Sequence, residues 1–103
     1  MVTYPIHVPR ADYRGTDSRK KEKAANHNRI AAELETYINA RLKAQTRPIQ
    51  QYLYHQIASD TGHSVETIRE LCFSIDGGHG GFTAFKSGMS AEQAMDAAAR
   101  GEE

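Results

Sequence analysis

The sequence predicts an all-α fold, a small helical bundle with an extended N-terminal arm and a C-terminal helix. Three observations support this prediction. Apolar residues recur at helical spacing over residues 18–45 and again over residues 48–75, and a segment with helix-capping residues closes the chain. A length of 103 residues is enough for one domain, and a content of 39% hydrophobic and 25% charged residues is typical of globular proteins.

Residues 1–17 are expected to form a flexible arm. They contain two prolines and one glycine and show no sustained periodicity, so we expect them to be extended and to become ordered only when something binds them. A long helix is predicted over residues 18–45, because five apolar residues fall on one helical stripe. These residues are Ile30, Leu34, Tyr37, Ile38 and Leu42.

Two shorter helices are predicted next. The first covers residues 48–60, since a proline at its start suits the first turn of a helix, and Gly62 follows its end. The second covers residues 64–74, with a serine as its N-cap. Its inward stripe consists of Ile68, Leu71, Cys72 and Ile75. With the long helix, these two helices form one helical domain over residues 18–76.

The last part of the chain is predicted to be a connector followed by a helix. Residues 77–89 are rich in glycine and are expected to be flexible, and their short stretch 82–85 is assigned to neither helix nor strand. Residues 90–103 are predicted to be helical, because Ser90 and Gln93 match a capping box and Gly101 is a typical helix terminator.

Residues 49–75 have the spacing of a helix-turn-helix. Two short helices that cross steeply need a small residue at their closest approach, and Ala58 provides it. The tight turn between them favours a left-handed backbone conformation, which Gly62 adopts at no steric cost. Apolar residues then hold the second helix against the first and leave its other face exposed. The alternative interpretation is a pair of helices inside an ordinary bundle.

Residues 61–69, with the sequence Thr-Gly-His-Ser-Val-Glu-Thr-Ile-Arg, resemble the recognition-helix region of bacterial helix-turn-helix regulators. The stretch is similar to that region in mercury-resistance-type regulators and to the Gly-x-Ser-x-x-Thr-Val/Ile pattern of lactose-repressor-type proteins. The resemblance implies that the second helix enters a groove of DNA, where Arg69 contacts guanine and Glu66 accepts from cytosine. The base-facing residues that it implies are Ser64, Val65, Glu66, Thr67, Arg69 and Glu70.

The charge of the chain is zero in total but uneven along its length. Residues 1–47 hold ten basic and five acidic side chains, whereas residues 48–103 hold three basic and eight acidic ones. Since phosphate contacts supply much of the affinity for DNA, we expect the basic half to face phosphate groups. The expected phosphate contacts are Arg19, Lys20, Lys21, Lys23, Lys43 and Arg47. The alternative is a basic helix face that is simply solvated.

No catalytic, metal or cofactor site is predicted. Cys72 and the histidines lack chelating spacings, and the glycines at 77–81 match neither a dinucleotide-binding fingerprint nor a phosphate-binding loop with its lysine. The place of Cys72 on an apolar stripe is typical of an inert thiol. No secretory signal or apolar run of ~18 residues is seen. With a single cysteine, these features predict a cytoplasmic protein with no membrane association.

The leading hypothesis is a sequence-specific DNA-binding transcriptional regulator. We expect a homodimeric repressor of bacterial operon, phage or plasmid type that reads a palindromic site in double-stranded DNA through residues 64–74. Two copies are expected because one helix-turn-helix reads few base pairs. The long first helix or the alanine-rich last helix would form the dimer interface, and no small-molecule ligand is predicted. The competing hypothesis is a helical protein-interaction adaptor that does not bind DNA.

Overall fold

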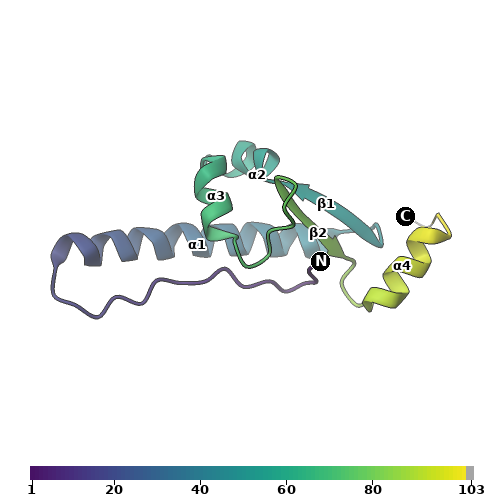
Figure 1. Cartoon of the computed structure of the whole chain (residues 1–103), viewed down its shortest axis with the longest axis horizontal. Helices are drawn as coiled ribbons and strands as arrows, with labels where there is room; N and C mark the ends of the chain where they lie inside the picture. Colours follow the sequence, from purple (N-terminus) through teal and green to yellow (C-terminus); the bar gives the residue numbers. More distant parts are fainter. Residues whose placement is uncertain (102–103) are drawn as a thin grey trace.

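The computed structural model describes residues 1–101 and shows a mixed fold of helices and strands (Figure 1). The predicted all-α class is therefore wrong. The elements, in chain order, are α1 (Ser18–Ala44), β1 (Ile49–Leu53), α2 (Tyr54–Thr61), α3 (Val65–Leu71), β2 (Gly81–Phe85) and α4 (Ala91–Ala99). Strands β1 and β2 pair in an antiparallel two-stranded sheet that brings together the two ends of the segment carrying α2 and α3.

Strand β1 replaces the first half of the helix predicted over residues 48–60. Its register pairs Ile49 with Phe85 and Leu53 with Gly81. The rings of Tyr52 and Phe82 stack across the sheet, with centroids 5.2 Å apart and planes 17° apart. An apolar residue at every fourth position fits a helix, but it is also compatible with a strand that continues into a helix. Residues 49–53 form a strand and not a helix because their backbone groups pair with those of β2.

Strand β2 lies inside the segment predicted to be a glycine-rich connector. Its two phenylalanines are buried in the folded protein, and burial of these large apolar side chains favours a packed strand over a solvent-exposed connector. Gly81 is required at the start of the strand, because a Cβ atom at this position would come within 1.9 Å of the carbonyl oxygen of Tyr52. The glycine therefore permits close strand pairing, a role that differs from the flexibility expected of a connector.

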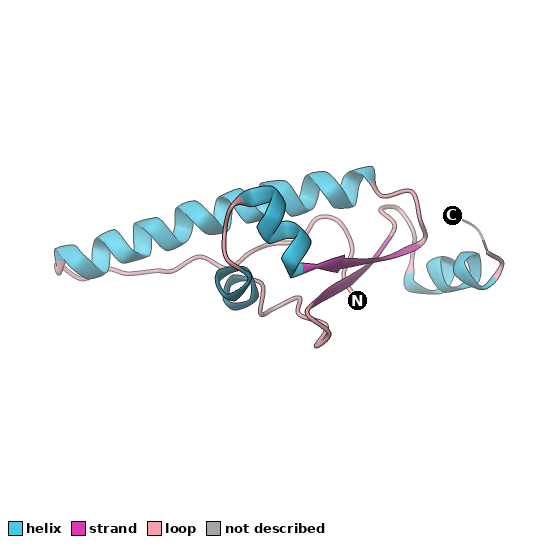
Figure 2. Ribbon diagram, turned by 90° about the horizontal axis from the view of Figure 1, so that it is seen from above, coloured by secondary structure: helices cyan, strands magenta, loops and turns pink. Residues whose placement is uncertain are grey.

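The hydrophobic core lies where α1, α2, α3 and the sheet meet. Helix α1 buries the predicted stripe at Leu34, Ile38 and Leu42, and Asp17 caps its first turn by accepting from two backbone N–H groups. The molecule measures 56 × 25 × 22 Å. The first half of α1 and the arm project beyond the core at one end of the long axis, and α4 lies at the other end (Figures 1 and 2).

Helix α4 begins as predicted, with the capping box of Ser90 and Gln93 present. Gly101 has a positive φ of 77°, as expected of a residue just after a helix. Ala94 and Ala97 are buried. The predicted helix extends to residue 103, and its last two residues lie outside the described part of the chain.

The N-terminal arm, residues 1–17, runs in extended form along α1 (Figures 1 and 2). Val2 bridges to Ala84 in parallel orientation and so covers the free edge of β2, while Ile6 and Val8 are buried in the core. This packed position differs from the flexible arm expected from the sequence. The reason is that the partners of the arm lie on a helix and a strand that are distant in the sequence.

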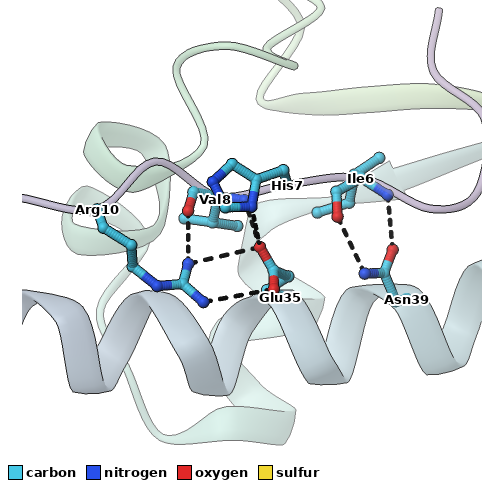
Figure 3. Close-up of polar contacts among 6 residues, drawn as sticks. All are labelled: Ile6, His7, Val8, Arg10, Glu35 and Asn39. Atoms are coloured by element: carbon cyan, nitrogen blue, oxygen red, sulfur yellow. Dashed lines mark hydrogen bonds and ion pairs between the residues drawn. The ribbon is translucent and has the colours of Figure 1, made fainter.

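Three polar side chains of α1 hold the backbone of the arm, and two of them, Glu35 and Asn39, are shown in Figure 3. The amide of Asn39 accepts from the N–H of Ile6 at 2.8 Å and donates to its carbonyl at 3.0 Å. Asn28 makes the same pair of bonds with Ala11, and Glu35 accepts from the N–H of Val8 at 2.8 Å. Glu35 also contacts the cationic side chain of Arg10 and the imidazole of His7. These bonds replace the hydrogen bonds to water that the backbone groups of the arm lose when the arm packs against α1.

Acid is expected to loosen the arm through Glu35. Partial burial alone would raise the pKa of this carboxyl, but the Val8 N–H and the Arg10 guanidinium outweigh burial and lower the pKa below its ordinary value of 4.5. The folded state therefore binds this proton less readily than the unfolded chain does, so its contribution to stability is present above pH 4.5 and is lost as the pH falls further. Urea unfolding measured from pH 7 to pH 3 should show the loss, and Glu35→Gln should reduce it. Glu22→Gln, at an exposed position of α1, is the matched control.

Candidate nucleic-acid interface

Helices α2 and α3 lie on either side of the turn at Gly62, in the segment where the sequence predicts a helix-turn-helix. Gly62 adopts the left-handed conformation with φ of 80°, and its N–H donates to the carbonyl of Ala58 at 2.9 Å. Ser64 caps α3 by accepting from the N–H of Thr67 at 3.1 Å. The glycine turn and the N-cap of the second helix are both confirmed. The first helix begins at Tyr54 and not at residue 48, because β1 precedes it, and the second ends at Leu71 and not at residue 74. The two helices run in different directions (Figures 1 and 2).

Helix α3 has one buried face and one exposed face. Ile68 and Leu71 are buried against the core, as the apolar stripe predicts. Four of the six predicted base-facing residues are exposed, and these are Ser64, Glu66, Arg69 and Glu70. Val65 and Thr67 are half-buried, and Val65 packs against the core. The structure therefore leaves a polar edge of α3 open to solvent, with one guanidinium between two carboxylates.

A polar stripe on α1 contacts the end of α2 and the turn that precedes α3. Glu33, Tyr37 and Arg41 are four residues apart and thus lie on one face of the helix. Glu33 contacts the imidazole of His63 at 2.7 Å, and Arg41 lies 3.5 Å from the carboxylate of Asp60. Tyr37 donates to the same carboxylate of Asp60 and receives a bond from Arg41 at 3.2 Å.

The hydrogen bond from His63 lowers the pKa of Glu33, although this carboxyl is near the surface. The contacts of this polar stripe reach both the end of α2 and the turn before α3, so they orient α3 relative to α1. From the sequence, Tyr37 was expected on the apolar stripe, and no role was predicted for Glu33 or Arg41. Their regular spacing of four beside the apolar stripe is the signal that points to them.

The predicted phosphate contacts fall into two groups. Arg19, Lys20, Lys21 and Lys23 are exposed on the first turns of α1, at the projecting end of the molecule. Lys43 is exposed in the last turn of α1, and Arg47 is exposed just after the end of that helix. With a rise of 1.5 Å per residue, the two groups are separated by about 35 Å along the helix. The structure does not gather these six residues into one basic patch.

Cys72 is fully buried after α3, and burial raises the pKa of its thiol to about 11. Such a thiol is unreactive. Among residues 1–101, no three histidine, cysteine or acidic side chains lie together in an arrangement that would hold a metal ion. In the same range, no helix combines the length and apolar character needed to cross a membrane. Comparison with known proteins gave no matching family model, no similar curated protein and no similar solved structure.

Proposed function

We propose that the protein is a sequence-specific DNA-binding transcriptional regulator that reads its site through α3. The observation that carries this proposal is the exposed edge of a capped helix after a glycine turn, with the other edge of that helix fixed in the core. Arg69 is the principal base contact, since its guanidinium can donate two hydrogen bonds to the O6 and N7 atoms of guanine. Glu66 is suited to accept from the amino group of cytosine.

The basic residues of α1 supply the contacts to phosphate groups in this proposal. The edge of α3 carries two carboxylates, which repel phosphates, so the affinity has to come from elsewhere on the molecule. The group at Arg19–Lys23 projects beyond the core and is accessible to the DNA backbone on one side of the groove that α3 occupies. Lys43 and Arg47 are accessible at the opposite end of the helix.

A homodimer on a palindromic site completes the proposal. Helix α3 is only seven residues long and presents few side chains, so one copy reads too few base pairs for useful discrimination. The interface is formed by α1 or α4. In α4, Met95 is exposed at 52% on a helix that is otherwise rich in alanine, which suits an apolar contact between copies.

A salt titration of binding to random duplex DNA tests the proposal. If all six basic residues of one protomer contact phosphates, the logarithm of the binding constant should fall with the logarithm of salt concentration with a slope of about −5. Replacing the four basic residues at positions 19, 20, 21 and 23 with alanine should reduce that slope by about 3 to 4. Absence of DNA binding at low salt would contradict the proposal.

A protein-interaction adaptor is the second candidate, and the charge of α3 favours it. Glu66 and Glu70 outnumber Arg69 on the exposed edge, and residues 48–103 hold three basic and eight acidic side chains. Such a surface suits a basic protein partner. In the same titration an adaptor gives no binding to duplex DNA at any salt concentration.

A further inference from the structure

A hollow of about 300 Å³ lies between the N-terminal arm and the first turns of α1. Ala11 and Tyr13 form its wall on the arm, and the helix contributes Lys20, Lys23, Ala24 and His27. The hollow lies at the projecting end of α1, away from the helix-turn-helix. Its volume falls at the small end of the range found for ligand pockets, about 300–1,000 Å³.

The basic side chains around the hollow have no partner within residues 1–101. Lys20, Lys23 and His27 follow one another at spacings of three and four, which places them on one face of α1. No hydrogen bond or ion pair of these three side chains is present in the described part of the chain. On the same helix, by contrast, Arg29 is paired with Glu33 and Arg41 with Asp60. Two ammonium groups and one imidazole therefore line the helix side of the hollow.

The other walls of the hollow are apolar and fixed in place. Asn28 holds the backbone of Ala11 by two hydrogen bonds of 2.7 and 3.0 Å. The hydroxyl of Tyr13 accepts from the N–H of Asp17 at 3.1 Å, which fixes the phenol ring. The methyl group of Ala24 faces the same space from the helix. An aromatic ring beside two alanines offers a surface for a planar group, next to the cationic side chains.

We propose that this hollow binds a nucleoside phosphate. The phosphate group contacts the ammonium groups of Lys20 and Lys23, and the base packs against the ring of Tyr13 and the alanines. A single inorganic phosphate fills only part of the volume and leaves the apolar walls without a partner. This site goes beyond the proposed DNA binding: it uses neither α2 nor α3, although it shares Lys20 and Lys23 with the proposed contacts to DNA phosphates.

Adenosine monophosphate is a suitable probe, with inorganic phosphate and adenosine as the two partial ligands. Titrations followed by NMR of the backbone amides should show saturable shifts confined to residues 11–27. Adenosine monophosphate should bind more tightly than either partial ligand, because it uses both the cationic and the apolar walls. Lack of saturable binding, or equal binding of inorganic phosphate and the nucleotide, would overturn the proposal.

The chain offers a closely matched pair of double variants. Lys20→Ala with Lys23→Ala removes two cations that line the hollow, whereas Arg19→Ala with Lys21→Ala removes two neighbouring cations that do not. The first pair should weaken nucleotide binding at least about tenfold, and the second less than about twofold. Similar losses in both pairs would show general attraction between charges and would contradict a defined site. Tyr13→Leu should reduce the preference for the nucleotide over inorganic phosphate, and circular dichroism checks that each variant is folded.

Discussion

Replacing Phe82 with alanine is expected to lower the free energy of unfolding by about 3–5 kcal/mol. Phe82 is fully buried in β2, stacks on Tyr52 and belongs to the core that also contains Ile68 of α3. Its removal leaves a cavity among buried side chains of the core. Since a domain of this size has a total stability of about 5–15 kcal/mol, the variant should be close to unfolding. Urea denaturation measures the change.

Phe73→Ala is the matched control for this variant. This substitution removes the same atoms as Phe82→Ala does, but from a side chain that is 68% exposed, just after α3. We expect its effect on stability to lie within about 0.5 kcal/mol. Equal losses for the two variants, or a small loss for Phe82→Ala, would contradict the packing of β2 against the core and would favour the flexible connector expected from the sequence.

Arg69→Ala is expected to weaken binding to a selected DNA site by about 1–3 kcal/mol, a factor of about 5 to 150. Binding to random duplex DNA should change much less, since that binding depends on phosphate contacts. Arg69 is exposed on α3, so the substitution should leave the fold intact. Lys86→Ala removes one positive charge from outside the helix-turn-helix and is the matched control.

The DNA provides a second control for Arg69. Replacing the guanine that Arg69 is proposed to contact with 7-deazaguanine removes the N7 acceptor and should weaken binding of the unaltered protein. The same replacement should have little further effect on Arg69→Ala, because the donor is already missing. If the variant bound the selected site as well as the unaltered protein does, the assignment of the reading face to this edge of α3 would be wrong.

The features that the sequence predicts correctly are those determined by neighbouring residues. The stripe of α1, the left-handed turn at Gly62 and the N-caps at Ser64 and Ser90 each depend on groups within about four positions. A side chain that caps its own helix, or a glycine that follows one, acts through local geometry alone. Such elements can be located before any tertiary contact is known.

The features that the sequence did not predict depend on distant partners. Strand β1 is stabilised by pairing with β2, and Ile49 lies 36 positions from its partner Phe85. The arm is held by Asn39 across 33 positions and by Glu35 across 27. Neither contact leaves a local pattern in residues 1–17. The only clue is on α1, where polar residues at 28, 35 and 39 share a helical face that borders the apolar stripe.

The candidate site was predicted in part. The exposed edge of α3 follows from its apolar stripe, and four of the six residues predicted to face bases are exposed on it, while their contact with bases stays a prediction. The excess of basic side chains in residues 1–47 does not determine whether these side chains lie together on one surface of the folded protein. Four of the six predicted phosphate contacts lie on the first turns of α1, whereas Lys43 lies near the end of the helix and Arg47 beyond it. His63 and Asp60, which link α1 to the segment of α2 and α3, find their partners only in the folded protein.

Selection of bound sequences from a pool of random duplexes is the most direct test of the central claim that α3 is a DNA-reading helix. If α3 reads DNA as proposed, we expect enrichment of a palindrome with a guanine in each half-site, and half-sites about one helical turn apart if two copies bind together. We also expect Arg69→Ala to enrich sequences without that guanine. A pool that remains random after repeated rounds, at a salt concentration low enough for phosphate contacts to form, would contradict this claim.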